Sequence, residues 1–174
     1  SKVSLKIKRK NQDSLLSVTV TREKIPLVSL DAAYLLTDAI GYIKLNRFAE
    51  PTYNEFKKAL TELIENGATK LVLDLRDNPG GYISSAQDIV DEFLEDNTLI
   101  LITKNKNGKQ EKTYATNKGS FKTGSLYVLI NENSASASEI VAGALQDNDK
   151  GVIIGRRSFG KGLVQREMGL GDGS

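Results

Sequence analysis

The sequence predicts an α/β fold in which strands alternate with helices around a largely parallel sheet. Three short apolar runs lack the strict polar alternation of half-exposed strands, as buried parallel strands do: Leu71–Leu75, Leu126–Ile130 and Val152–Ile154. Segments with helical spacing of apolar residues separate these runs, as in βαβ units. The length of 174 residues suits about one globular domain.

The N-terminal residues predict a β-hairpin outside this pattern. Residues 3–9 and 15–21 are two runs in which apolar and polar residues alternate, and a polar turn lies between them. The segment from Arg22 to Asp38, which contains Pro26, is expected to be a connector. Because two strands alone are only marginally stable, we expect the hairpin to belong to a neighbouring module.

The α/β pattern begins at Gly41, where Gly41–Leu45 predicts a strand. Thr52 and Glu55 have the spacing of a capping box that opens a helix, and Asn66-Gly67 ends that helix. The remaining expected elements, in order, are the strand Leu71–Leu75, a helix from Ile83 to Leu94, a hairpin of Thr98–Thr103 with Gln110–Ala115, the strand Leu126–Ile130, a helix over Ser138–Gln146 and the strand Val152–Ile154.

The composition excludes several classes of catalytic site. The chain has no His and no Cys, so it cannot build a Ser-His-Asp triad, a thiol nucleophile, or a zinc or iron–sulfur centre made from imidazoles and thiolates. The net charge of +2 comes from scattered residues and does not predict a nucleic-acid partner. No apolar run approaches the roughly 20 residues of a membrane span.

Three loops follow the carboxyl ends of predicted strands, which is the edge where ligands usually bind in open α/β sheets. The first loop reads Asp-Leu-Arg-Asp-Asn-Pro-Gly-Gly over residues 74–81. Its paired glycines allow backbone N–H groups to approach a ligand just before a helix begins. An ordinary strand-to-helix turn is the alternative interpretation.

The second loop reads Asn-Glu-Asn-Ser-Ala-Ser-Ala-Ser-Glu over residues 131–139. Serines in this loop lie near the positive end of the following helix, which favours a developing alkoxide or oxyanion. The alternative is that Ser136 and Glu139 form a capping box whose only role is to start the helix.

The third loop, Gly155–Gly162, fits the phosphate-binding pattern G-x-x-x-x-G-K. However, Gly162 stands where magnesium binding needs Ser or Thr, and residues 163–174 show no helical period. Nucleotide binding is therefore the weaker interpretation of this loop. The remaining alternative is that Lys161 is an ordinary exposed lysine.

Considered together, the loops supply a serine at a helix N-terminus, a lysine in a Gly-rich turn and a Gly-Gly turn at one edge of the sheet. Because His is absent, lysine is the remaining base for a serine nucleophile. Such a base works near neutral pH when its pKa falls from about 10.4 to about 7–8. Burial near Phe159 and the charges of Arg156 or Arg157 are the expected causes of that shift.

These loops resemble the motifs of the C-terminal processing peptidases, also called tail-specific proteases. The three ordered motifs are Leu-Asp-Leu-Arg-Asp-Asn-Pro-Gly-Gly, then Ser-Ala-Ser-Ala-Ser-Glu-Ile-Val-Ala-Gly-Ala-Leu-Gln-Asp, then Gly-Arg-Arg-Ser-Phe-Gly-Lys-Gly-Leu-Val-Gln. Their order and spacing are highly specific, and the resemblance covers roughly residues 41–174.

By this resemblance, Ser136 is the middle serine of Ser-Ala-Ser-Ala-Ser and matches the family's nucleophile, while Lys161 matches its general base. Ser134 and Ser138 are the competing assignments for the nucleophile. Gln165 matches the glutamine that orients the lysine in members with a Ser-Lys-Gln triad.

The resemblance also implies an oxyanion hole made of the Ala137 amide and one amide of the Gly80-Gly81 turn. In the implied reaction the lysine takes the serine proton, the alkoxide attacks a peptide carbonyl, and water later hydrolyses the acyl-enzyme. No metal or organic cofactor is implied.

The implied fold is the layered α/β core of that family, with mostly parallel strands, flanking helices and a distant likeness to crotonase and caseinolytic-protease cores. Residues 1–28 are expected to be the last strands of a truncated PDZ-like domain and a linker. Residues 29–174 are expected to be the peptidase core, truncated at its C-terminal end.

The implied function is a serine endopeptidase that cleaves unfolded or C-terminally tagged polypeptides, which it binds through their C-terminal ends. The alternative is a non-catalytic peptide-binding or scaffold domain of the same fold. The resemblance implies an extracytoplasmic location, in the periplasm or cell envelope, and leaves self-association into a homo-oligomer open.

Overall fold

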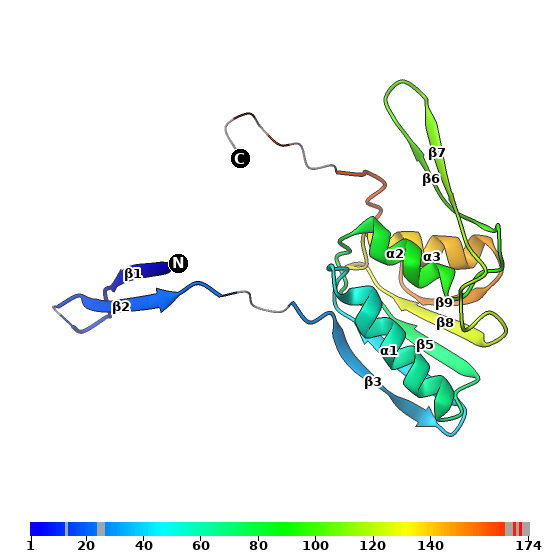
Figure 1. Ribbon diagram of the computed structural model, residues 1–174, viewed down its shortest axis with the longest axis horizontal. Helices are drawn as coiled ribbons and strands as arrows, with labels where there is room; N and C mark the ends of the chain where they lie inside the picture. Colours follow the sequence, from blue (N-terminus) through cyan, green and yellow to red (C-terminus); the bar gives the residue numbers. More distant parts are fainter. Residues whose placement is uncertain (13, 24–26, 166–168, 170, 172–174) are drawn as a thin grey trace.

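A five-stranded sheet forms the centre of the protein, as Figure 1 shows. The computed structural model describes residues 1–12, 14–23, 27–165, 169 and 171. The strand order is β3-β4-β5-β8-β9, with β3 antiparallel to β4 and the other neighbours parallel. These strands are β3 (Leu30–Thr37), β4 (Ile40–Leu45), β5 (Lys70–Asp74), β8 (Ser125–Ile130) and β9 (Gly151–Gly155).

The predicted α/β class and its largely parallel sheet are therefore confirmed. The helices are α1 (Thr52–Glu65), α2 (Ile83–Asp91) and α3 (Ala137–Asp147). The second helix ends earlier than expected, because residues 92–94 leave the helix, although Phe93 and Leu94 remain buried in the core. The apolar residues continue past the end of the helix because their pattern indicates which side chains are buried. The buried segment therefore ends later in the sequence than the helix does.

Helices α1 and α3 pack against the same face of the sheet. Leu63 of α1 lies against Gly41 and Leu71, and Leu145 of α3 lies against Leu126 and Gly151. Leu71 is in register with Leu126 on the neighbouring strand, so both contacts are on one face. The hydrophobic core therefore fills the space between that face and the helices. The opposite face carries a row of larger side chains that are half-buried or exposed: Tyr34, Tyr42, Val72, Tyr127 and Val152.

Strand β3 corrects the expectation that residues 22–38 form a connector. Leu30–Thr37 pairs with β4 as an edge strand, and Leu30 and Leu35 pack against the core. The carboxylate of Glu55 in α1 accepts hydrogen bonds from the Ser29 and Leu30 amides, at 2.8 and 3.0 Å. This long-range contact fixes the start of the strand. Pro26, on which the connector interpretation partly rested, lies outside the described residues.

The same contact explains why the expected capping box of α1 does not form. Glu55 binds the start of β3, and Thr52 is buried, where its hydroxyl accepts from the Ala49 amide and donates to Ser29 Oγ. The helix nevertheless begins at Thr52, after Pro51. The predicted start of the helix is correct, and the predicted capping hydrogen bonds of Thr52 and Glu55 are wrong.

Strands β6 (Leu99–Lys104) and β7 (Gln110–Tyr114) form the expected antiparallel hairpin, which projects from the core (Figure 1). Its turn is held by Asn105, whose side-chain oxygen accepts from the Asn107 and Lys109 amides. Its base is tied to α2, because Gln87 Nε2 donates to Thr113 Oγ1 at 3.0 Å.

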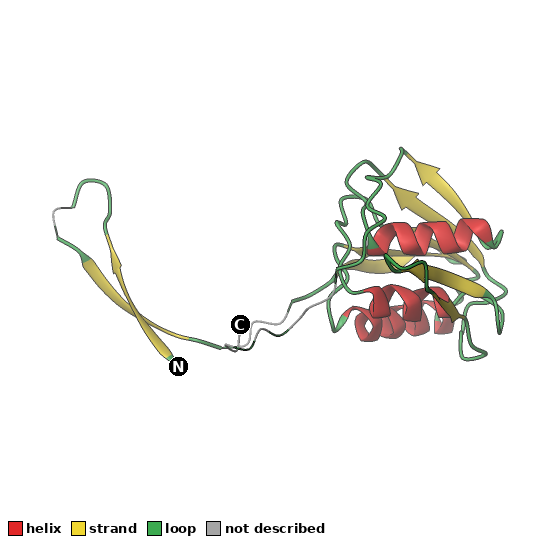
Figure 2. Cartoon of the chain, turned by 90° about the horizontal axis from the view of Figure 1, so that it is seen from above, coloured by secondary structure: helices red, strands yellow, loops and turns green. Residues whose placement is uncertain are grey.

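Strands β1 (Lys2–Ile7) and β2 (Leu16–Thr21) form the predicted N-terminal hairpin. It stands apart from the α/β core in the view of Figure 2. Its apolar side chains are largely exposed, including Leu5, Ile7, Leu16 and Val20. Within the described residues, no helix has the length and apolar character needed to cross a bilayer.

Candidate active site

The loops that follow β5, β8 and β9 meet at the carboxyl edge of the sheet, as the sequence predicts. A cavity of about 570 Å³ opens between them. Its lining combines predicted site residues from all three loops with side chains from α2 and the β6–β7 hairpin. The predicted residues in its wall are Gly80, Gly81, Ser136, Lys161 and Gln165.

The Gly-Gly turn is pressed against the serine loop. Gly80 has a φ of +95°, and a Cβ at this position would lie 2.6 Å from the Ala135 carbonyl oxygen and 2.9 Å from Ser136 Cβ. Its own carbonyl accepts from the Phe48 amide. Only glycine fits both this conformation and this close approach.

The two glycine amides of the turn are used differently. The Gly80 N–H donates to Asn78 Oδ1 at 2.9 Å, so it is not available to a ligand. The Gly81 N–H forms no hydrogen bond with any part of the chain that the structure describes, and Gly81 lines the cavity. The expected oxyanion donor from this turn is therefore Gly81, and Gly80 has a packing role.

The three serines of the second loop have distinct surroundings. Ser134 and Ser138 are fully buried, and their hydroxyls donate to the Leu75 and Asn78 carbonyls at 2.7 and 2.9 Å. Ser136 alone of the three lines the cavity. Its backbone has a φ of 55° and a ψ of −111°, a conformation that L-residues rarely adopt and that is common at functional sites.

Ser136 is the N-cap of α3, and Ala137 is the first residue of the helix. Ala137 is buried, and its N–H has no hydrogen-bond partner among the described residues. It is one of the orphan amides at a helix N-terminus, where the helix dipole favours negative charge. The predicted capping box with Glu139 also forms. Ser136 therefore both caps the helix and lies at its positive end, which are the features that the two interpretations of this serine expected.

Glu139 does much more than cap the helix. Its carboxylate accepts four hydrogen bonds: Oε1 from Ser158 Oγ and the Gly160 amide, and Oε2 from the Ser136 and Lys161 amides, at 2.6 to 2.8 Å. Burial raises the pKa of this carboxyl, but the hydrogen bonds outweigh it and lower the pKa below the usual glutamate range. One carboxylate thus joins the serine loop to the lysine loop.

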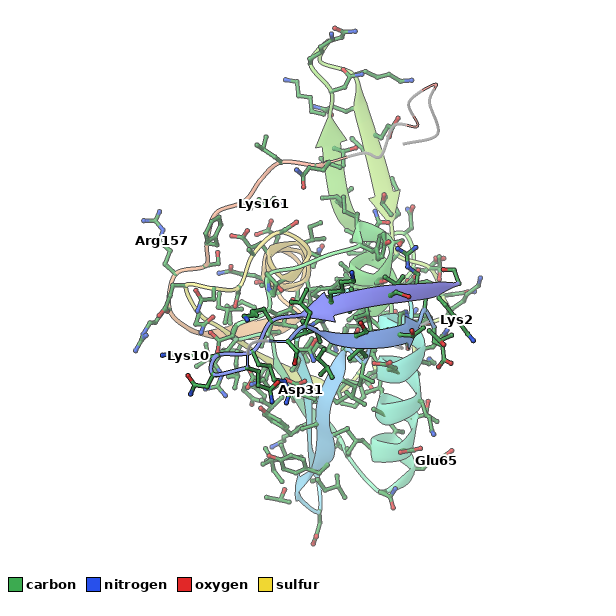
Figure 3. All side chains as sticks on the ribbon, turned by 90° about the vertical axis from the view of Figure 1, so that its left-hand side faces the viewer. Lys2, Lys10, Asp31, Glu65, Arg157 and Lys161 are labelled. Atoms are coloured by element: carbon green, nitrogen blue, oxygen red, sulfur yellow. The ribbon has the colours of Figure 1, made fainter. Side chains whose placement is uncertain are left out.

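Lys161 lies on the loop that passes beside the N-terminal part of α3 (Figure 3). It lines the first cavity and a second one of about 480 Å³, and Ser136 lines both. The small residues Gly143 and Ala144 of α3 and residues 99–102 of β6 contribute to the wall of the second cavity, as do Glu139 and Ile140. Ser136 and Lys161 therefore stand at the junction of two cavities.

The expected burial of Lys161 is not present. The lysine is exposed, and Phe159, which was expected to cover it, has 68% of its surface accessible. Arg156 pairs with Glu132 at 3.1 Å. The aromatic ring stays in solvent because the loop is held by backbone bonds to Glu139 and Ser134, and neither bond requires the ring to pack.

The phosphate-loop interpretation of Gly155–Gly162 is contradicted by the fold. Residues 163–165, which follow the loop, are not helical, whereas phosphate binding by this pattern requires a helix N-terminus. The backbone amides of Gly160 and Lys161 are already donated to Glu139. In the described part of the chain, no group of three or more acidic side chains is placed to hold a metal ion.

Asp74, to which the sequence pattern assigned no role, is the last residue of β5 and anchors the start of the first loop. Asp74 is buried, and Tyr42 Oη and the Arg76 guanidinium donate to its carboxylate, the latter through Nε at 2.9 Å. Burial raises its pKa, but the bonds from Arg76 and Tyr42 reverse the effect and lower it. Burial and this carboxylate raise the pKa of Tyr42 to about 12. The sequence feature that could have indicated this ion pair is an Asp and an Arg two residues apart at the end of a strand.

Comparison with known proteins agrees with this geometry. The chain is 40% identical over 179 residues to a carboxyl-terminal-processing protease of Synechocystis sp., covering 100% of this chain and 41% of that protein. It is 37% identical over 176 residues to the carboxy-terminal processing protease CtpB of Bacillus subtilis, covering 100% of this chain and 36% of that protein. The chain thus spans about two fifths of the length of these curated relatives.

Among solved structures, the photosystem II D1 C-terminal processing protease matches with a TM-score of 0.74 and 30% identity, over 99% of this chain and 48% of that one. The family model of peptidase family S41 matches residues 39–174, which include β4, β5, β8, β9, the three helices and all three loops of the site. The chain therefore belongs to peptidase family S41.

Proposed function

We propose that the protein is a serine-type peptidase in which Ser136 is the nucleophile and Lys161 the general base. The observation that carries this proposal is the position of Ser136 at the junction of two cavities that Lys161 also lines. The strained backbone of Ser136 and the buried hydroxyls of its two neighbouring serines support the same assignment.

The proposed reaction proceeds through an acyl-enzyme. The neutral amine of Lys161 accepts the proton of Ser136 Oγ while that oxygen bonds to the peptide carbonyl carbon. When the C–N bond breaks, the lysine ammonium gives the proton to the leaving amine. A water molecule then loses a proton to the lysine and attacks the ester carbon. The lysine ammonium returns that proton to Ser136 Oγ as the ester C–O bond breaks, which releases the new carboxyl terminus and restores the Ser136 hydroxyl.

The carbonyl oxygen becomes negatively charged in both tetrahedral intermediates. The amides of Ala137 and Gly81 are the proposed donors, because neither N–H is used by another described residue. Both belong to loops that Gly80 holds in van der Waals contact. Donors fixed in this way before the reaction are typically worth 10²–10³ in kcat each, on the order of 3–4 kcal/mol.

Substrate binding is the proposed source of the desolvation that a lysine base needs. Lys161 is exposed in the free protein, and a polypeptide lying across the two cavities would cover it. Removal of water disfavours the ammonium form and so favours the neutral base. Gln165 lines the same cavity, and we assign it the role of orienting the lysine amine.

The proposed substrates are unfolded or C-terminally exposed polypeptides, outside the cytoplasm. The relatives' printed names describe carboxyl-terminal processing and support the C-terminal preference, whereas the unfolded state of the substrates and the location rest on the family resemblance. The N-terminal hairpin is proposed to be the end of a PDZ-type domain that precedes the peptidase core at residue 29. The matches that extend over 100% of the chain, hairpin included, support its belonging to the same kind of protein.

Cleavage of an unstructured protein by the chain and by two variants tests this function. We expect the parent to cleave, Ser136→Ala and Lys161→Ala to lose at least about 100-fold in rate, and the parent rate to rise with pH between 6 and 10. Lys118→Ala, which removes an exposed lysine outside both cavities, is the matched control and should cleave like the parent. Undiminished cleavage by Ser136→Ala refutes the assignment.

A further inference from the structure

Asn78 is a fully buried polar side chain in the first loop of the site. Its Nδ2 donates to the Leu45 carbonyl at 3.0 Å, and its Oδ1 accepts from the Gly80 amide at 2.9 Å. The side chain therefore ties the Gly-Gly turn to the end of β4. An asparagine suits this place because it supplies one donor and one acceptor from the same amide.

The backbone of Asn78 reaches the serine loop. Its carbonyl oxygen accepts from the Ala135 amide at 3.1 Å and from Ser138 Oγ at 2.9 Å. These two partners flank Ser136 on either side. Asn78 thus connects the turn that carries one proposed oxyanion donor with the loop that carries the nucleophile and the other donor.

The side-chain bond of Asn78 withdraws the first of the two glycine amides from the cavity. Because Gly80 gives its N–H to Asn78 Oδ1, the peptide plane before Gly80 is fixed toward the protein interior. The following amide, that of Gly81, keeps no partner among the described residues, and Gly81 forms part of the cavity wall. Asn78 itself does not line either cavity, so it can act only through these neighbours.

We infer that Asn78 is a positioning residue of the oxyanion hole: it holds the Gly80 amide while the Phe48 amide holds the Gly80 carbonyl, and together these bonds aim the Gly81 amide at the carbonyl oxygen of the substrate. This inference rests on the proposed function. Loss of the Asn78 side chain frees the Gly80 N–H and removes the bond to Leu45, so the backbone bonds to Phe48 are left to hold the turn and the Gly81 amide is less firmly fixed.

Two variants separate positioning from simple stability. Asn78→Ala removes both side-chain bonds, whereas Asn78→Asp keeps the acceptor for Gly80 and loses the donor to Leu45. Thr52→Val is the matched control, since Thr52 is equally buried, links two segments by hydrogen bonds and lines neither cavity.

We expect Asn78→Ala to lose about 100-fold in kcat per folded molecule, the size typical of a lost oxyanion donor, with KM within about 3-fold of the parent. Asn78→Asp should lose less, because it retains the bond to Gly80, and it carries the same comparison if the alanine variant does not fold. Thr52→Val should keep the parent kcat per folded molecule. An Asn78 variant that also keeps the parent kcat overturns the inference.

Hydrogen exchange at the Gly80 amide tests the inference without any reaction. The rate should rise at least about 10-fold in Asn78→Ala and stay at the parent value in Thr52→Val. If the parent chain cleaves no substrate, the proposed function fails for this chain, and exchange alone decides the role of Asn78. Faster exchange then upholds its hold on the turn, and an unchanged rate overturns it.

Discussion

Ser134 and Ser136 lie on one short loop and Ser138 lies in the first turn of α3, and the hydrogen bonds of each hydroxyl distinguish them. Burial makes an unpaired hydroxyl costly, so Ser134 and Ser138 donate to backbone carbonyls and cannot also serve as free nucleophiles. Ser136 stands where the chain turns sharply into α3, and its strained backbone presents it to the cavities.

Glu139 illustrates how one carboxylate can organise a site by holding two of its loops together. An ionised carboxylate offers about four acceptor positions, and Glu139 has four donors around it. Three of these come from residues 158–161. The lysine loop is therefore attached to the N-terminus of α3 mainly through this side chain.

Replacing Glu139 with glutamine should detach the lysine loop. The amide nitrogen of Glu139→Gln is a donor that would face two N–H or O–H donors, so at least two bonds are lost at about 1.5–3 kcal/mol each. We expect trypsin to cut after Lys161 faster and peptide cleavage to fall at least about 10-fold. Glu92→Gln is the control. Glu92 is buried and, like Glu139, accepts several hydrogen bonds, but it lies outside both cavities. The Glu92→Gln variant should therefore lose stability and keep the parent kcat.

Some features of the site can be predicted from the sequence, and others depend on how individual side chains are oriented. Motif spacing and the family resemblance select Ser136, Lys161 and the Gly-Gly turn as candidates, because the proposed chemistry needs those residue types at strand ends. It cannot show that Gly80 gives its amide to Asn78, since that depends on how a buried side chain is turned. Nor can it show that Phe159 points into solvent, because a loop held by its backbone leaves its side chains unconstrained.

Strand β3 is the element that the sequence pattern conceals. Leu30–Thr37 has no regular alternation of apolar and polar residues, and its pairing with β4 contains register shifts. Its position depends on Glu55 from α1, a residue that is distant in sequence. By contrast, the parallel strands were predicted within one residue because their two faces are both largely apolar, although the face toward the helices is the more buried one.

Removing the Glu55 carboxylate should loosen this edge of the sheet. Glu55→Ala leaves the Ser29 and Leu30 amides without their charged acceptor, so urea unfolding should report a loss of about 1–3 kcal/mol. Glu62→Ala on the same helix removes only an exposed 3.9 Å ion pair with Lys58 and should cost under about 0.5 kcal/mol. Equal effects of the two substitutions would refute the anchoring role of Glu55.

The whole molecule divides into a β-hairpin and an α/β core, and the core carries every described residue of the site. Within the core, three buried or half-buried carboxylates hold loops in place: Asp74, Glu92 and Glu139. For each, burial raises the pKa, and the hydrogen bonds around it reverse that effect and lower the pKa.

These lowered pKa values predict how stability depends on pH. A carboxyl whose pKa is lower in the folded than in the unfolded state stabilises fully above the unfolded value of about 4, and the contribution disappears as pH falls through the folded value. The free energy of unfolding should therefore be nearly constant from pH 7 to 5 and fall below pH 4. Glu92→Gln should show a shallower fall, and a parent stability that is unchanged down to pH 3 would contradict this explanation.

Covalent labelling tests whether Ser136 is a nucleophile that Lys161 activates. The chain is incubated with a peptidyl phosphonate that reacts with activated serines, and the modified residue is located by mass spectrometry. We predict a single label on Ser136, which forms faster as pH rises and forms at least about 100-fold more slowly in Lys161→Ala. A label on Ser134 or Ser138, or equal labelling of Ser136 in Lys161→Ala, would contradict the claim.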